Sequence, residues 1–491
     1  MNYIGIDLGT SAVKLLLVDE KGNILNSVSK EYPLFFPHPG RSEQNPADWY
    51  EGVCRGLAKL LENADASLVK GIGVGGQMHG LVVLDENDEI IRPAILWNDG
   101  RTEKQVEYLN EVIGRERLSA YAANIAFAGF TAPKILWMRE NEPENFRRIS
   151  KIMLPKDYIV YKLTGVHSCD YSDASGMLLL DVKNKKWSAE MLEICGVREK
   201  QLPALYESYE AVGTVKAEFA QSYGLGEVKV AAGAGDNAAA AIGTGTVGEG
   251  KCNISLGTSG TIFIAGEKFG VDSNNALHSF AHADGKYHLM GCMLSAASCN
   301  KWFMEDILHD ADYAGNQQKI TKEMLGENRV FFLPYLMGER SPINDVNARG
   351  MFTGLSMDTK REDMLLAVLE GVAFAIRDSF EKAKALGIKI TASDICGGGA
   401  KSELWQTILA NVLGIRLDKV KTEQGPGYGG AILAMCACGE YASVEAACRA
   451  LVEISSSVYP EKELTEKYEK KYRQFAKLYP ALKEFFKETA E

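Results

Sequence analysis

The sequence predicts an α/β protein made of two halves of related fold, and two observations support this. Stretches typical of strands alternate with stretches typical of helices, which indicates layers of helix and sheet. The tetrapeptide Leu8-Gly9-Thr10-Ser11 also recurs as Leu256-Gly257-Thr258-Ser259, close to half the chain length later. Because both copies lie between two predicted strands, the repeat indicates a duplicated architecture.

The first half is predicted to contain a strand hairpin, a helix and two more strands. In chain order their ranges are 3–8, 13–18, 47–63, 70–75 and 81–85. The helix begins at Asn45-Pro46, a pair typical of a helix start. The run Gly71-Ile-Gly73-Val-Gly75-Gly76 has the spacing of a dinucleotide site, but a strand rather than a helix follows it. We therefore reject a nucleotide role there and expect a turn.

The second half repeats the hairpin and then adds helices. The predicted ranges are strands at 252–256 and 261–265, a helix at 360–386, a strand at 388–396 and a helix at 402–413. The glycine-rich segment 243–250 supplies no core and predicts a boundary, which gives domains at 1–245 and 246–491. From Glu461 the Lys/Glu-rich chain is predicted to form a solvated covering helix.

The composition narrows the classes of function. The chain has 491 residues, 46% hydrophobic and 24% charged, so disordered and fibrous proteins are excluded. The net charge of −11 disfavours sequence-independent binding of nucleic acid, because an acidic surface repels phosphate backbones. Ten scattered cysteines without CxxC spacing are typical of reduced thiols in a cytoplasmic protein. The sequence shows neither a membrane span nor a secretion signal, so we expect no membrane association.

The repeated turns are candidates for phosphate binding. A tight glycine turn exposes successive N–H groups, and Thr and Ser add hydroxyl donors. Two such turns that face each other would hold a triphosphate from both sides, whereas the alternative is a pair of ordinary hairpins. Asp7 precedes the first turn in an apolar strand, where an unpaired carboxylate is costly. Beside a phosphate its natural partner is hydrated Mg²⁺, and the alternative is a structural Asp that caps the turn.

Asp236 is the second candidate carboxylate. It lies in Gly233-Ala-Gly235-Asp236-Asn237, directly before an Ala-rich run. An Asp in this position is a good helix N-cap. The flanking glycines also let a ligand approach, and a carboxylate there would accept the proton of a substrate hydroxyl during phosphoryl transfer. The residues themselves leave the cap and the general base as equal alternatives.

Four further features are typical of ligand pockets. Gln77-Met78-His79-Gly80 ends a strand, where ligand sites of α/β sheets collect. Trp97-Asn98-Asp99 combines aromatic and polar groups that suit a sugar, and Gly397–Ala400 offers bare backbone to an adenosine. Trp302, on a helix from Ser295, either stacks on a base or packs in the core. A core role is the alternative for His79 and Trp97 as well.

Together these residues resemble the FGGY family of carbohydrate kinases. The segment Gly129-Phe-Thr131-Ala-Pro-Lys134-Ile-Leu-Trp137-Met-Arg-Glu-Asn141 is similar to the family's first signature, and Gly350-Met-Phe352-Thr-Gly354-Leu355 with Ala367-Val-Leu-Glu370-Gly371 is similar to its second. The resemblance runs from about residue 3 to beyond 430. Gln77–Gly80, Ser42-Glu43-Gln44 and Leu96–Asp99 resemble the branch of the family that phosphorylates D-xylulose.

The resemblance implies two actin-like ATPase (ribonuclease H-like) domains with the active site in the cleft between them. Residues 1–245 would bind the sugar and one phosphate turn, and residues 246–491 would bind the nucleotide. The implied reaction is ATP-dependent phosphorylation of D-xylulose to D-xylulose 5-phosphate. Asp236 would be the general base, and Asp7 would act through Mg²⁺, by way of water. The implied partners are ATP and the sugar, and a homodimer is left open.

The resemblance also assigns binding roles. The sugar would contact Met78, His79, Trp97, Asp99 and Asn237. The phosphates would lie among Thr10, Ser11, Lys14, Gly257, Thr258 and Ser259, and the nucleoside would contact Trp302, Gly398, Gly399 and Ser402. Some family members carry Asn at position 402, so the contact of Ser402 would be weaker or indirect. The alternatives are a kinase for another ketose or polyol (ribulose, fuculose, gluconate, glycerol) and an actin- or chaperone-type ATPase.

Overall fold

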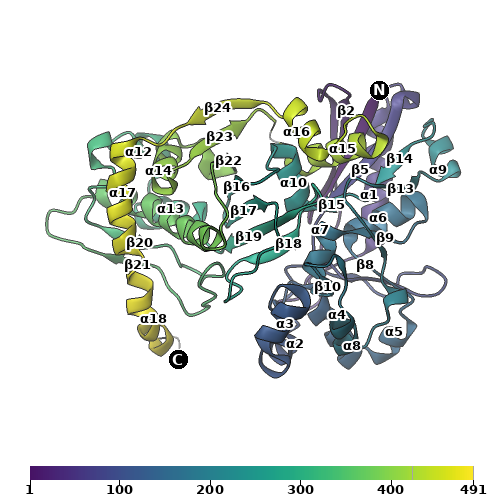
Figure 1. The fold of residues 1–491 in the computed structure, drawn as a ribbon, viewed down its shortest axis with the longest axis horizontal. Coiled ribbons are helices and arrows are strands. Elements are labelled where there is room, and N and C mark those ends of the chain that lie inside the picture. Colours follow the sequence, from purple (N-terminus) through teal and green to yellow (C-terminus); the bar gives the residue numbers. More distant parts are fainter. Residues whose placement is uncertain (423, 490–491) are drawn as a thin grey trace.

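The computed structural model describes residues 1–422 and 424–489, which form two lobes that each contain a seven-stranded sheet (Figure 1). The strands of the first sheet are β1 (Asn2–Leu8), β2 (Ala12–Asp19), β3 (Ile24–Glu31), β5 (Val69–Gly76), β13 (Ala211–Thr214), β14 (Lys229–Ala231) and β15 (Ala234–Gly235). The strands of the second sheet are β16 (Lys251–Leu256), β17 (Gly260–Gly266), β18 (His278–Ala281), β19 (Tyr287–Met293), β22 (Ala392–Cys396), β23 (Arg416–Val420) and β24 (Ile454–Val458).

The two sheets share one strand arrangement. The first has the order β13-β14-β5-β1-β2-β3 with β15 beside β5, and the second has the order β18-β19-β17-β16-β22-β23-β24. In each sheet an antiparallel hairpin (β1–β2, β16–β17) is followed by a strand parallel to its first member (β5, β22). The repeated tetrapeptides form the turns of these two hairpins. The predicted α/β class and the two related halves are thereby confirmed.

Helices cover both sheets. Those of the first half are α1 (Pro46–Leu61), α2 (Glu103–Glu107), α3 (Arg115–Ala122), α4 (Thr131–Asn141), α5 (Pro143–Arg148), α6 (Pro155–Thr164), α7 (Tyr171–Ala174), α8 (Ala189–Cys195), α9 (Ala217–Ser222) and α10 (Asp236–Thr244). Those of the second half are α11 (Ala297–Lys301), α12 (Tyr313–Gln317), α13 (Arg361–Ala385), α14 (Glu403–Leu413), α15 (Gly425–Cys438), α16 (Val444–Leu451), α17 (Lys462–Phe475) and α18 (Leu478–Thr489). No helix in the described ranges combines the length and apolar character that a membrane span requires.

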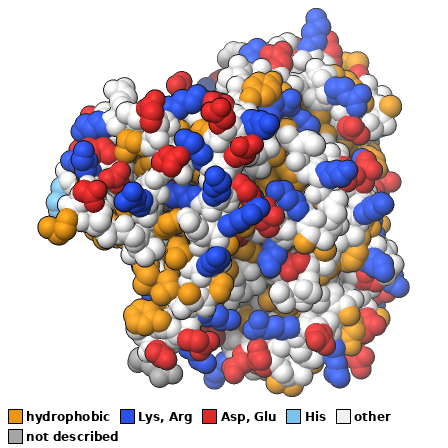
Figure 2. Space-filling view, turned by 60° about the vertical axis from the view of Figure 1, so that its left-hand side comes forward, with side chains coloured by type: hydrophobic (Ala, Val, Ile, Leu, Met, Phe, Trp, Pro, Cys, Tyr) orange, Lys and Arg blue, Asp and Glu red, His pale blue; other side chains and the backbone are white. Residues whose placement is uncertain are grey.

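Five short strand pairs connect these layers. They are β4 (Glu43–Gln44) with β7 (Ala94–Ile95), β6 (Val82–Leu84) with β8 (Lys151–Met153), β9 (Ser168–Asp170) with β12 (Ala204–Tyr206), β10 (Leu180–Asp181) with β11 (Lys186–Trp187), and β20 (Phe331–Leu333) with β21 (Met351–Thr353). On the molecular face in Figure 2, side chains of Lys and Arg are interspersed with those of Asp and Glu.

The sequence placed most helix and strand ranges correctly, because their end signals are local. The α1 helix begins at Pro46, and the Asn45 side chain accepts a hydrogen bond from the backbone N–H of Ala47 at 3.1 Å. The strand expected at 388–396 is shorter: β22 begins at Ala392, because its partner β16 begins opposite, at Lys251. The expected covering helix is two helices, α17 and α18, and α17 buries one face that includes Tyr468 and Phe475.

Two glycine-rich segments differ from the expectation. The run 71–76 belongs to the buried strand β5 (Val69–Gly76), so the strand predicted at 70–75 is confirmed and the turn expected within it is wrong. The segment 243–250 was expected to supply no core, yet Thr246 is fully buried and donates a hydrogen bond to Asp394 at 2.9 Å. Val247 also joins a hydrophobic cluster with α10, α15 and α16. The glycines of β5 are explained by the close packing of α15 on the first lobe.

Helix α15 comes from the second half of the chain but lies on the first sheet (Figure 1). A Cβ atom on Gly5 of β1 would lie 1.8 Å from the carbonyl oxygen of Gly427, and one on Gly73 of β5 would lie 2.0 Å from that of Gly430. The same helix meets α10 as closely, because a Cβ on Gly429 would lie 1.8 Å from the carbonyl oxygen of Ala239. Backbone therefore packs directly on backbone, which only glycine permits.

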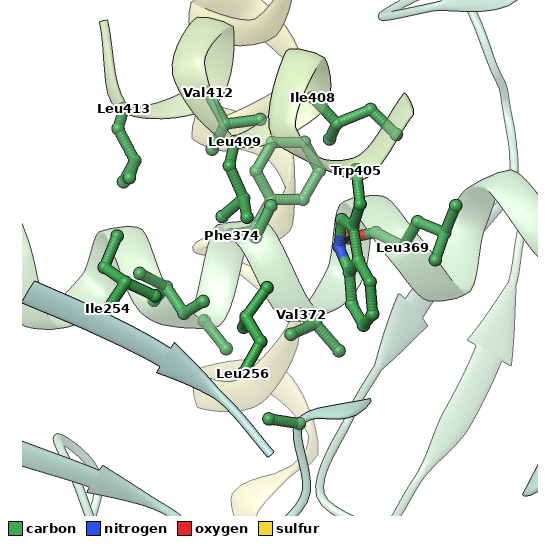
Figure 3. Close-up of a cluster of buried hydrophobic side chains, with 14 of the residues drawn as sticks. Ile254, Leu256, Leu369, Val372, Phe374, Trp405, Ile408, Leu409, Val412 and Leu413 are labelled. Carbon is green, nitrogen blue, oxygen red and sulfur yellow. Dashed lines mark hydrogen bonds between the residues drawn. The ribbon is translucent and has the colours of Figure 1, made fainter. Parts of the chain in front are cut away.

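The core of the second lobe lies between its sheet and two helices. Figure 3 shows Trp405 of α14 and Leu369 of α13 beside Leu256, the last residue of β16. The indole N–H of Trp405 donates a hydrogen bond to the carbonyl oxygen of Leu369 at 2.9 Å, so this buried ring has its polar group satisfied. This packing fixes α14 against the end of β16, where the second tetrapeptide turn begins.

The glycine contacts predict a large effect of one added methyl group. Gly73→Ala is expected to lower the free energy of unfolding by about 3 kcal/mol, because the methyl meets backbone that cannot rotate away. Urea denaturation measures this change. Gly226→Ala is the matched control: no atom lies within 4 Å of its Cβ position, so it should change stability by less than about 0.5 kcal/mol. Equal stability of the two variants would contradict the proposed packing role.

Candidate active site

Three parallel strands end together at one edge of the first sheet. Asp7 of β1 and Ala234 of β15 both lie opposite Gly75 of β5. Ligand sites of open α/β sheets lie at this carboxyl edge. The register therefore places Asp7 level with the segment that leads, two residues later, to Asp236 at the start of α10.

Asp236 is not the N-cap of α10. Gly235 occupies the cap position and supplies no side-chain hydrogen bond. Instead, Oδ1 of Asp236 accepts hydrogen bonds from the backbone N–H of Asn237 at 2.7 Å and from its Nδ2 at 2.9 Å. Asn237 thus orients the carboxylate and leaves Oδ2 to receive a ligand.

Asp7 acts electrostatically on Asp236, the second carboxylate of this edge. Burial and the negative charge of Asp7 together raise the pKa of Asp236 to about 7, against the lowering effect of its hydrogen bonds from Asn237. Burial also raises the pKa of Asp7 to about 6, while Lys14, opposite it on β2, acts in the lowering direction. The pair therefore combines a group that can accept a proton near neutral pH with a negative charge that suits a cation.

The two tetrapeptide turns differ in how their hydroxyls are used. In the first turn, Thr10 donates a hydrogen bond to Gln77 at 3.3 Å and accepts one from the Trp97 indole at 3.0 Å. Ser11 is exposed. In the second turn, Thr258 and Ser259 are exposed, and the carbonyl oxygen of Thr258 accepts a hydrogen bond from Ser298 Oγ at 2.7 Å. Thr10 therefore secures Trp97, while the other three hydroxyls remain accessible.

A cavity of about 450 Å³ opens beside Asp236, and both halves of the chain line it. The first half contributes Met78, His79, Trp97, Asn98, Asp99, Gly100, Phe127, Ala128, Gly129, Phe130, Asp236 and Asn237. The second half contributes Ser259, Gly260, Thr261, His278, Met290, Cys292, Met293, Leu294 and Arg340. The structure thus brings together every residue predicted to contact the sugar, in one space of the size of a small ligand.

His79 and Asp99 have different functions at this cavity. Burial lowers the pKa of His79 to about 3, so its imidazole is neutral at pH 7. Its Nδ1–H donates a hydrogen bond to the carbonyl oxygen of Gly176 at 2.8 Å, which leaves Nε2 as an acceptor. Asp99 is 1% exposed and accepts four hydrogen bonds from Ser42 and Arg101. Its carboxylate therefore fixes the loop that carries Trp97.

A second cavity of about 990 Å³ belongs entirely to the second half. Its lining includes Leu256, Gly257, Thr258, Ala297, Ser298, Asn300, Lys301, Tyr313, Gln317, Gly398, Gly399, Lys401, Ser402 and Trp405. Gly399 lies on Leu256 and Trp405, where an added Cβ would lie 2.9 and 3.0 Å from their side chains. Ser402 caps α14 by accepting from the Trp405 N–H at 3.0 Å, and it donates to Gln317 at 2.6 Å.

The second tetrapeptide turn lies between the two cavities. Gly257 and Thr258 line the larger cavity, whereas Ser259 lines the smaller one. A phosphate chain held at this turn would therefore extend from a ligand in the larger cavity toward Asp236 in the smaller one.

Among the described residues, five that were predicted to belong to the site line neither cavity: Asp7, Thr10, Ser11, Lys14 and Trp302. The Trp302 ring is partly buried and stacks on Phe332, with centroids 6.1 Å apart, against the core of the second lobe. Lys14 lies opposite Asp7 on β2 and is not part of either lining. Sequence reasoning missed His278 and Arg340. The sequence offers one weak signal for each residue. His278 is one of only seven histidines, and Arg340 lies in the stretch Gly-Glu-Arg-Ser-Pro.

The donor set fits a magnesium ion bound with a nucleotide rather than one caged by protein. Among the residues that the structure describes, no three His, Cys, Asp or Glu side chains converge on one metal position. Asp7 lies beside a turn of backbone N–H groups and exposed hydroxyls. One carboxylate plus phosphate oxygens is the usual binding mode of Mg²⁺.

Comparison with known proteins identifies related chains over the full length. Residues 2–243 match the N-terminal domain of the FGGY family of carbohydrate kinases, and residues 252–438 match its C-terminal domain. The xylulose kinase of Escherichia coli (strain K12) is 39% identical over 98% of this chain and 99% of its own length. That of Bacillus subtilis (strain 168) is 37% identical over 99% of this chain and 98% of its own length.

Solved structures also match this chain over nearly its full length. A xyloylose kinase from Brucella ovis matches with a TM-score of 0.94 and 39% identity, covering 99% of this chain and 100% of its own. A gluconate kinase from Lactobacillus acidophilus matches with a TM-score of 0.91 and 27% identity, covering 98% of both chains. A Plasmodium falciparum glycerol kinase with ADP, at 22% identity and a TM-score of 0.87, covers 96% of this chain and 98% of its own and shares the fold.

The interaction of the two carboxylates predicts a measurable coupling of their pKa values. In the ligand-free protein, ¹³C NMR of the aspartate carboxyls should give Asp236 a pKa of about 7. Asp7→Asn should lower the Asp236 pKa, because losing a neighbouring negative charge makes deprotonation easier. Asp236→Asn assigns the resonance. An Asp236 pKa that is the same in the Asp7→Asn variant would show that the two groups do not interact.

Proposed function

From its membership of the FGGY family of carbohydrate kinases and the geometry of its site, we propose that this chain transfers the γ-phosphoryl group of ATP to D-xylulose, giving D-xylulose 5-phosphate. The observation that supports this best is the turn at Gly257–Ser259, which borders a larger cavity on one side and the cavity of Asp236 on the other. Full-length likeness to xylulose kinases indicates the sugar.

Asp236 is the proposed general base. Asp236 lines the smaller cavity, and Asn237 holds its Oδ1, so Oδ2 would receive the proton of the acceptor. As the 5-hydroxyl of the sugar attacks phosphorus, Asp236 takes its proton, and a pKa of about 7 matches this task at neutral pH. His79 Nε2 is placed to accept a hydrogen bond from another sugar hydroxyl. Met78 and Trp97 contribute to the apolar part of the lining.

The phosphates are proposed to lie between the two turns, with Ser11, Thr258 and Ser259 as hydroxyl donors. Asp7 would hold Mg²⁺ through water, and the ion, when bound, would neutralise charge on the phosphates. The nucleoside would occupy the larger cavity on Gly398, Gly399 and the Ser402–Gln317 pair. Positioning of the two substrates and exclusion of water would supply most of the acceleration.

The domain boundary, location and assembly are proposed on separate grounds. The two sheets divide between residues 1–245 and 246–491, although α15 of the second range packs on the first sheet. A cytoplasmic location is supported by the cysteines, which form no disulfide in the described parts of the chain. A homodimer remains a proposal that light scattering would test.

A kinase for another ketose or polyol is the second candidate. The likeness to a gluconate kinase structure favours this candidate, because that protein has the same fold and is named for an acceptor other than xylulose. The sequence also left open an actin- or chaperone-type ATPase. Such an ATPase would have no use for the cavity beside Asp236, to which we assign the sugar. The family match to carbohydrate kinases also argues against it.

The base assignment predicts a selective loss of turnover. Asp236→Asn should lower kcat by roughly 10²- to 10⁴-fold, because the acceptor hydroxyl loses its proton acceptor. ATP affinity, measured by calorimetry, should change less than about twofold, since Asp236 does not line the nucleotide cavity. The exposed Asp306→Asn is the matched control for losing one carboxylate. Near-normal turnover of Asp236→Asn would show that another group takes the proton.

The sugar assignment predicts the order of acceptors in a coupled assay of ADP formation. D-xylulose should give the highest kcat/KM of a panel that also contains D-ribulose, L-fuculose, gluconate and glycerol. The physical reason is that each acceptor must fill the same 450 Å³ cavity and reach Asp236 with a terminal hydroxyl. A higher kcat/KM for another member of the panel would reassign the acceptor and leave the kinase assignment intact.

A further inference from the structure

Lys134, on the first turn of α4, is a buried cation that the reaction itself does not use. Its side chain is 0% exposed. Burial lowers the pKa of its ammonium group to about 7, against the attraction of Asp99. No ion pair of Lys134 exists within residues 1–422 and 424–489. Because an unpaired buried ammonium is costly, its hydrogen bonds require an explanation.

Both hydrogen bonds of Lys134 go to backbone at the acceptor cavity. Its Nζ donates to the carbonyl oxygen of His79 at 2.9 Å and to that of Gly129 at 2.6 Å. His79 and Gly129 line the cavity from two different segments, whereas Lys134 itself does not line it. Lys134 therefore connects two segments of the cavity lining by hydrogen bonds, without lining the cavity itself.

The turn that Lys134 holds is one that needs support. His79 has φ of 70°, a left-handed conformation that is costly for a residue other than glycine. Its carbonyl oxygen accepts a second hydrogen bond, from Thr131 Oγ1 at 3.0 Å. Two donors from α4 thus fix one peptide group and, with it, the direction of the His79 side chain.

The same turn also reaches the proposed base. Met78 precedes His79, and its Sδ lies 3.9 Å from Nδ2 of Asn237, the residue that orients Asp236. A Cβ on Gly235 would lie 2.8 Å from Met78, so Met78 packs directly on the segment before Asp236. A shift of the turn would therefore move sugar contacts and disturb the support of Asp236.

We propose that Lys134 is a positioning residue of the sugar site, which fixes the left-handed Met78–His79 turn and the Gly129 wall by donating to two backbone carbonyls. The proposal rests on the assignment of this cavity to the sugar. It assigns Lys134 no contact with either substrate, so removing its donors should weaken sugar binding far more than ATP binding.

Lys134→Met tests this, because Met keeps much of the length and apolar stem but donates nothing. In the folded variant, KM for the sugar should rise roughly tenfold or more, while the Kd for ATP should stay within about twofold. Lys471→Met is the matched control. Lys471 is 3% exposed and pairs with Glu370 in the second lobe, far from this cavity, so its loss should lower Tm without a selective rise in KM.

Thr131→Val is the second variant, needed if Lys134→Met does not fold. It removes the other donor to the His79 carbonyl and should raise KM for the sugar in the same direction, by a few-fold. A crystal structure of either variant should show His79 displaced from φ of 70°. An unchanged KM for the sugar in a folded Lys134→Met, or in Thr131→Val, would overturn the proposal. So would a proportional loss of ATP affinity.

The test separates this proposal from the sugar assignment. KM is measured with whichever acceptor the wild-type enzyme uses best in the panel. If that acceptor is not D-xylulose, the sugar assignment fails while the role of Lys134 is still decided by the selective change in KM.

Discussion

The architecture depends on the contact of helix α15 with the backbone of the first sheet. Gly427 and Gly430 of α15 meet Gly5 and Gly73 of β1 and β5 so closely that a single Cβ would overlap a carbonyl oxygen. The helix belongs to the second half of the chain, so this contact joins the lobes. It also holds α10 in place, because Gly429 lies against Ala239. The ends of β1 and α10, which carry the two carboxylates, are positioned by the same contact.

Placing two carboxylates at this edge has an electrostatic consequence. Burial favours the protonated form of both Asp7 and Asp236, and the negative charge of Asp7 adds to this effect at Asp236. A bound cation would balance this electrostatic cost. Phosphate binding by backbone turns, as proposed here, needs no basic molecular surface, which agrees with a net charge of −11. The accessible hydroxyls of the two turns would add donors to those of Lys301 and Lys401 in the larger cavity.

The acceptor cavity shows how far single-sequence reasoning can reach. Met78, His79, Trp97 and Asn237 could be predicted, because each follows a strand end or a glycine pair. The sequence also predicted Asp99 at the cavity, but it did not predict what its carboxylate does. That carboxylate is hydrogen-bonded by Ser42 and Arg101, partners that only the folded loop provides. His278 and Arg340 come from the second lobe, and no local pattern indicates that they approach a site of the first.

The sequence by itself determined what depends on neighbours along the chain. These are the alternating elements, the two turns of the repeat, the helix starts such as Asn45-Pro46 and the identity of the two carboxylates. The tertiary structure decided what depends on distant neighbours. It made the glycines of the predicted strand at 70–75 a packing surface for α15, and it placed Trp302 on Phe332. It also gave the cap position of α10 to Gly235, while Asn237 holds Oδ1 of Asp236. Close approach and burial are set by atoms far apart in sequence, and these decide both packing and pKa.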